Sequence, residues 1–173
     1  MRTSGPLPTP RADGGTPSRM DGVASDLRYV AVDRVTATVA EVMGPSEFVQ
    51  WRAVDDGRGR PGEWRTLEQG GSLDERFEIR TGLGARVTLQ LGSEGKVVVH
   101  RLSRARVERK IRSDGESQVG VTLYRGLMEV EGVVDGAAVH VRTPDQVFPV
   151  RGRVLFEYDA FRGTSAREFR PQN

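Results

Sequence analysis

The chain has 173 residues, of which 36% are hydrophobic and 29% are charged, and its formal net charge is +2. This is the size of one domain, or of a smaller domain with a tail. The absence of cysteine excludes disulfides, thiolate nucleophiles and cysteine–zinc sites, and His100 and His140 are too few for a histidine-rich metal centre. No apolar run approaches the roughly 18 residues of a membrane-spanning helix, so we expect no membrane span.

The basic residues are almost all arginine, because only Lys96 and Lys110 are lysines. A GC-rich genome would favour arginine codons and would explain this bias without any function. The functional explanation is a surface that makes bidentate contacts to carboxylate, phosphate or sulfate, which arginine makes better than lysine. Clustering of the arginines decides between the two explanations.

The chain begins with a segment rich in proline and glycine and poor in apolar residues. Such a segment buries too little surface to offset its ordering entropy, so we predict a disordered tail over residues 1–27. The apolar central stretch of a secretory signal is missing, so we expect no signal peptide in this sequence.

From residue 28 onward, apolar and polar residues alternate in short stretches that glycines separate, and helical periodicity is missing. We predict strands at 34–42, 48–51, 77–80, 86–91, 96–102, 105–112, 119–123, 128–130, 139–142 and within 147–158. Short strands at about ten-residue spacing predict an all-β fold, either a sandwich, barrel or roll or a β-solenoid-like stack. We place this β domain at residues 28–162 and a polar C-terminal tail at 163–173.

The strongest turn signal is the polar segment 113–117, which contains Asp114-Gly115. An Asp-Gly pair tolerates the positive φ of a hairpin turn, so we predict a hairpin with strands near 104–112 and 118–124.

The first strand of this hairpin carries the densest basic stretch of the chain. Strand alternation places four cations on one face, with Glu108 among them: Arg104, Arg106, Lys110 and Arg112. Gln118, Thr122 and Tyr124 would face them and would not neutralise them. We therefore predict an anion-facing stripe formed by the four cations and Tyr124. The alternative is the solvated outer face of a sheet.

Turns between short strands require residues that tolerate positive φ or close backbone approach. The glycines predicted to serve this purpose are Gly82, Gly84, Gly92, Gly95, Gly126 and Gly152. Pro144 is predicted to end a strand, because proline cannot donate a ladder hydrogen bond. Trp64 is predicted to be a core residue or a lid over one sheet face, with a sugar-stacking platform as the alternative.

Several motifs follow one another in a fixed order along residues 34–160. They are Trp64/Leu67/Gly70/Leu73, Arg80-Thr81-Gly82-Leu83-Gly84-Ala85-Arg86, Gly92/Gly95, Leu123/Gly126/Val130, Arg142-Thr143-Pro144 and Val150-Arg151-Gly152. Each motif alone is weak, but their order and spacing together resemble the FecR domain.

This resemblance implies a β-rich, partly solenoid-like module of the bacterial cell envelope. In the namesake regulators the module is periplasmic, receives a signal from an outer-membrane transducer and relays it to a cytoplasmic anti-sigma segment. The family has no known catalytic residues, and the sequence shows neither the membrane helix nor the anti-sigma segment of the regulators. A periplasmic or cell-envelope location is therefore an expectation from the resemblance alone.

Two functions remain open at this point. The first is a non-catalytic FecR-like module for protein interaction, signalling or scaffolding, with an envelope receptor or another envelope protein as partner. The alternative is an anion- or polysaccharide-binding β-domain that uses the basic face of 104–112. We expect no catalytic residues, no cofactor and no metal. We also expect no specific nucleic-acid binding, because Tyr124 is the only aromatic residue near the stripe.

Overall fold

The computed structural model describes residues 29–33, 36–55, 58–74, 76–92, 95–112, 117–132 and 138–169. The predicted tail at 1–27 lies outside these ranges. The strands are β1 (Tyr29–Asp33), β2 (Ala37–Met43), β3 (Val49–Ala53), β4 (Arg65–Thr66), β5 (Ser72–Leu73), β6 (Phe77–Thr81), β7 (Arg86–Leu91), β8 (Gly95–Val99), β9 (Arg104–Arg112), β10 (Ser117–Glu131), β11 (Ala138–Arg142), β12 (Val147–Val150), β13 (Arg153–Asp159) and β14 (Gly163–Glu168). Within these ranges one 3-10 turn, η1 (Ser46–Phe48), accompanies the strands, so the predicted all-β class is confirmed.

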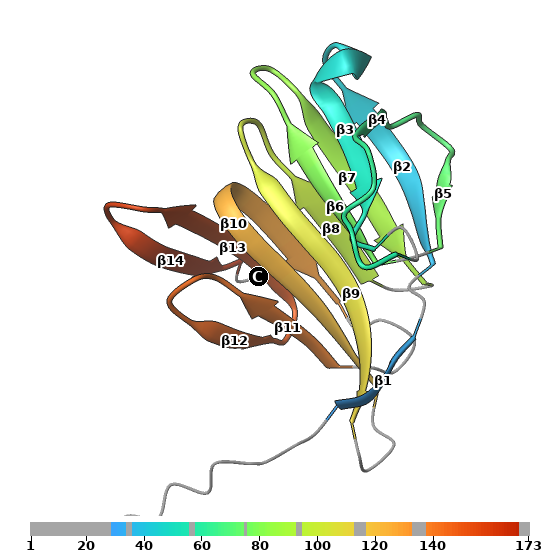
Figure 1. Cartoon of the computed structure of the whole chain (residues 1–173). Coiled ribbons are helices and arrows are strands. Elements are labelled where there is room, and N and C mark those ends of the chain that lie inside the picture. The colour runs from blue at the N-terminus through green and yellow to red at the C-terminus, as the bar shows by residue number, and fades with distance from the viewer. Residues whose placement is uncertain are drawn as a thin grey trace, which may run out of the picture.

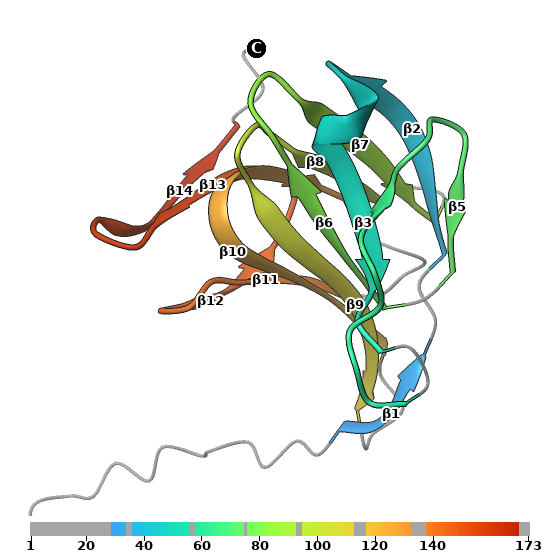
Figure 2. The ribbon, with the colours of Figure 1, turned by 45° about the horizontal axis from the view of Figure 1, so that its top comes forward.

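The strands form one curled sheet, a half-barrel that folds over its own core (Figures 1 and 2). One side of the curl has the order β4-β3-β6-β9-β10, and the other continues as β10-β8-β7-β2-β5. Neighbouring strands are antiparallel except for the parallel pair β10 and β11. Of the predicted arrangements the roll is therefore correct and the solenoid-like stack is wrong, because the strands pair mainly antiparallel within one curled sheet. No helix within the described ranges is long and apolar enough to cross a membrane.

Strand β10 joins the two sides of the curl. Its first half pairs with β9, and the half after Gly126 pairs with β8 and β13. Gly126 has φ +91°, and the register shifts between Leu123 and Arg125. Short strands broken at Gly126 were the expectation from sequence. The glycine instead bends one continuous strand of fifteen residues.

The core lies inside the curl and is made of alternate residues of the facing strands. Ile79 on β6 and Ala105 on β9 are buried there, together with Leu123 on β10. The residues between them, such as Glu78 and Arg104, therefore face outward from the curl. This alternation places Arg52, Arg80 and Arg106 on the outer face as well.

The predicted boundary at residue 162 is wrong, because 163–168 forms strand β14 and pairs with β13. The segment is polar because β14 is an edge strand with exposed side chains, so no apolar alternation marks it. The Thr164 hydroxyl hydrogen-bonds the hydroxyl of buried Thr143 at 2.7 Å, and it also contacts Asp145. These bonds attach the last hairpin to the turn after β11.

The residues predicted for turns mostly occupy them. Positive φ values are found at Gly84, Gly92, Gly126 and Gly152. Gly82 has no positive φ, but a Cβ there would lie 2.9 Å from the Cβ of Phe48, so close approach is its reason. Gly95 is the first residue of β8 rather than part of a turn, and Pro144 follows the end of β11 as predicted.

Candidate functional site

Two rows of polar residues cross the outer face of strands β3, β6, β9 and β10. Cross-strand partners form the first row in the order Gln50, Arg80, Arg104, Arg125, and the second in the order Arg52, Glu78, Arg106, Thr122. We call Arg80, Arg104 and Arg125 the arginine row. Arg125 joins it because the bulge at Tyr124 shifts the register by one residue.

Glu78 lies at the centre of the second row, and its side chain is only 2% exposed. It accepts hydrogen bonds from Arg52 at 2.8 and 3.0 Å, from Arg104 at 2.8 Å, and from Arg106 at 2.7 and 3.2 Å. Burial alone would raise the pKa of Glu78, but the hydrogen bonds from these arginines outweigh it and lower the pKa to about 2. Glu78 is therefore ionised at neutral pH and fixes three guanidinium groups at once.

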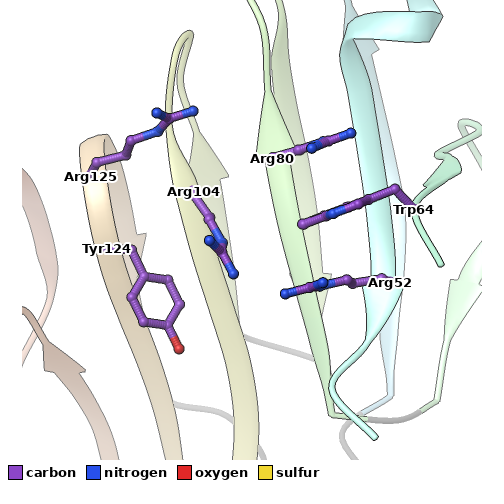
Figure 3. A pocket seen from close by; sticks show the side chains of 6 residues that line it. All are labelled: Arg52, Trp64, Arg80, Arg104, Tyr124 and Arg125. Atoms are coloured by element: carbon purple, nitrogen blue, oxygen red, sulfur yellow. The ribbon is translucent and has the colours of Figure 1, made fainter. Parts of the chain in front are cut away.

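Trp64, just before β4, lies between two arginines. The guanidinium carbons of Arg80 and Arg52 are 4.3 and 4.6 Å from its ring centroid, and the two groups flank the indole on opposite sides (Figure 3). Trp64 is thus neither a core residue nor an open sugar-stacking platform, because cations cover both faces of the ring. The predicted lid is closest to what is observed, and the cation–π contacts fix the direction of both arginines.

The arginine row lines a pocket of about 380 Å³ together with Arg52, Trp64 and Tyr124. Arg80 donates its Nε hydrogen to Gln50 Oε1 at 2.8 Å, and neither Arg80 nor Arg125 forms an ion pair with a residue that the structure describes. The Nε of Arg104 is buried without a hydrogen-bond partner. Like charges directly opposite each other destabilise a sheet, and in this row only Arg104 has a carboxylate partner, Glu78, among the described residues.

Tyr124 and Glu108 complete this face. The Tyr124 ring centroid is 5.2 Å from the guanidinium of Arg104 and 5.5 Å from that of Arg106, and burial raises the pKa of the Tyr124 hydroxyl. Burial alone would lower the pKa of Arg106, but the hydrogen bond to Glu78 and, to a smaller extent, the charge of Glu108 raise it. Among the described residues named here, five arginines and two carboxylates give an excess of three positive charges. The arginines are Arg52, Arg80, Arg104, Arg106 and Arg125.

The sequence correctly placed Arg104, Arg106 and Tyr124 together, and the predicted hairpin is confirmed as β9 and β10. Lys110 and Arg112 belong to β9, but their side chains lie outside the described part of the chain. Sequence reasoning missed the neighbours of the stripe: Arg52, Trp64, Glu78, Arg80 and Arg125. They lie next to it because β6 pairs with β9, and no local pattern reveals this long-range pairing.

The composition of the pocket lining indicates which kind of ligand it can bind. The lining contains four arginines, a tryptophan and a tyrosine. Within the described ranges, no group of three or more histidine, aspartate or glutamate side chains could hold a metal ion. The arrangement is suited to binding an anion.

No model of a known protein family, no curated protein and no solved structure matches this chain. The resemblance to the FecR domain stays a prediction from the ordered motifs.

Proposed function

We propose that the protein is a non-catalytic binding module whose arginine row binds carboxylate, phosphate or sulfate groups of a larger partner. The observation that carries this proposal is the direct opposition of Arg80, Arg104 and Arg125 on three adjacent strands. Such a row costs stability in the free protein, and a bound anion would compensate it.

The surrounding residues prepare the row for a ligand. Glu78 fixes Arg104, and Trp64 together with Gln50 fixes Arg80. Fixed side chains lose less conformational entropy when a ligand binds, which raises affinity. The terminal nitrogens of Arg80 make no hydrogen bond with a described residue, so they can form the two parallel bonds that an oxyanion accepts.

The ligand would be recognised by its charge. The indole faces are covered, so stacking on a sugar or a base has no open platform. An acidic segment of a protein or a sulfated or phosphorylated polymer fits this face. The resemblance to the FecR domain supports a protein of the cell envelope as the partner, and this identity remains a prediction.

A heparin-binding measurement tests the proposal. We expect the Arg80→Gln/Arg125→Gln double variant to lose at least about tenfold in affinity and to reduce the slope of log affinity against log salt concentration by about two, because two ion contacts disappear. Both side chains lack ion pairs within the described residues, and their removal relieves the repulsion in the row, so the variant should melt no lower than the wild type.

The matched control is Arg167→Gln, which removes an exposed arginine from β14. Each of the three substitutions removes one positive charge, but Arg167 does not line the pocket. If it weakens heparin binding per charge as much as the double variant does, or if the wild-type protein ignores heparin, the proposal is wrong.

A further inference from the structure

Four large apolar side chains project from one end of the half-barrel. Met43, Phe48, Leu83 and Leu102 are between 45% and 67% exposed. They belong to η1 with the residue that ends β2, and to the β6–β7 and β8–β9 connections, which lie together at the top of Figures 1 and 2. We call these four residues the apolar tips.

Backbone hydrogen bonds hold the connections together. The Gly82 N–H donates to the Phe48 carbonyl at 2.7 Å, and the Leu102 N–H donates to the Gly82 carbonyl at 3.2 Å. A Cβ on Gly44 would collide with the backbone of Gly84, so these two turns also touch. The apolar tips are therefore held in one fixed array.

Leu102 is the most informative of the tips. Its φ is +56°, the one positive φ of a non-glycine residue in the described part of the chain. This conformation disfavours leucine relative to glycine or asparagine. The side chain is 54% exposed, so it gains little burial in return. Folding of this chain does not explain a leucine here, whereas contact with a second apolar phase does.

The apolar tips adjoin the arginine row along the same strands. Phe48 precedes Gln50 by two residues and Leu102 precedes Arg104 by two, which is about 7 Å along a strand. Arg101, beside Leu102, is also exposed. The end of the half-barrel thus combines protruding apolar side chains with a flank of cations.

We propose that this end of the molecule docks on the surface of a lipid bilayer that contains anionic headgroups. The tips enter the boundary between headgroups and acyl chains, and the arginine row contacts lipid phosphates. Interfacial binding of this kind grows with buried apolar area and with attraction to anionic lipid. The inference rests on the proposed function and identifies the bound anion as the phosphate of a lipid headgroup.

A bilayer suits this surface better than a protein groove does. The tips protrude from separate turns, and a soft planar phase buries each of them without having to match their shape. The cations on the flank complement anionic headgroups. Glu47 of η1 is an acidic residue at the same end.

Vesicle co-sedimentation of the full chain tests the inference, with heparin binding measured in parallel. We expect binding to vesicles of phosphatidylcholine with phosphatidylglycerol, and none to phosphatidylcholine alone. The Leu83→Ser/Leu102→Asn variant should lose about tenfold in vesicle affinity while its heparin affinity stays unchanged. Asparagine tolerates positive φ, so the melting temperature should not fall because of position 102.

Val147→Thr is the matched control, because Val147 is 55% exposed on β12 and is not one of the tips. It should bind vesicles and heparin like the wild type. Wild-type binding to heparin without binding to vesicles overturns the inference and leaves the proposed function standing. Normal vesicle binding by the Leu83→Ser/Leu102→Asn variant would also overturn the inference and leave the proposed function standing. So would a variant that loses binding only to soluble poly-glutamate, because the apolar tips would then contact an acidic protein. A wild-type protein that binds neither heparin nor vesicles overturns both proposals.

Discussion

Replacing Glu78 with glutamine is expected to lower the free energy of unfolding by about 3 kcal/mol. The substitution removes the negative charge that Arg52, Arg104 and Arg106 share, and it leaves three guanidinium groups facing one another. Breaking a buried ion pair on one side costs about 3–5 kcal/mol, and the partial exposure of the arginines places the expected loss at the lower end. Chemical denaturation at neutral pH measures it.

The loss should depend on pH in a defined direction. The pKa of Glu78 falls from 4.5 to about 2 on folding. A lowered pKa stabilises the folded protein above the unfolded value, and this contribution disappears as the pH falls through the folded value. The stability difference between wild type and Glu78→Gln should therefore be full above pH 4.5 and shrink as the pH approaches 2.

Glu41→Gln is the control for this experiment. Glu41 pairs with Arg86 at 3.0 Å, but its side chain is 47% exposed, so removing its charge should cost less than about 1 kcal/mol. Equal stability losses in the two variants would show that the buried carboxylate of Glu78 does not hold Arg52, Arg104 and Arg106 in place.

Replacing Gly126 with alanine is expected to destabilise the protein by at least about 3 kcal/mol or to prevent folding, by strain added to overpacking. Gly126 combines φ +91° with a close contact: a Cβ there would lie 2.7 Å from the Cα of Ser103 and closer still to its Oγ. Ser103 is fully buried, and its hydroxyl both accepts from the Leu127 N–H and donates to the Leu127 carbonyl. The added methyl group would force β10 away from the turn before β9. Thermal unfolding and soluble yield measure the effect.

Gly152→Ala separates the two causes. Gly152 has φ +87°, but a Cβ there meets nothing within 4 Å. Its substitution should cost only the conformational term of about 1–2 kcal/mol. If both variants lose the same stability, the close contact between Gly126 and Ser103 does not contribute to the destabilisation.

The sequence predicts the features of this protein that depend on neighbours along the chain. Alternation within 105–112 and the Asp114-Gly115 turn correctly predict the β9–β10 hairpin and the shared face of Arg104 and Arg106. The same alternation within 77–80 places Glu78 and Arg80 on one face of their strand. It does not reveal that this strand lies beside β9, because that pairing depends on the way the whole sheet curls.

Three further features escaped local patterns for separate physical reasons. The bulge at Tyr124 changes which residues of β10 face outward, and Arg125 therefore lies opposite Arg104 in the row. Trp64 lies outside the strands, so alternation does not place it between two arginines. Strand β14 is polar and lies at an edge, so it resembles a frayed tail in sequence.

The central claim, that the arginine row forms one binding site for the anionic groups of a partner, is tested most directly by an NMR titration of the arginine Nε–H resonances with sulfate or a heparin oligosaccharide. We predict that the resonances of these three residues shift together along one saturating curve, while that of Arg167 stays in place. Shifts spread evenly over all exposed arginines, or a row that does not respond, would contradict the claim.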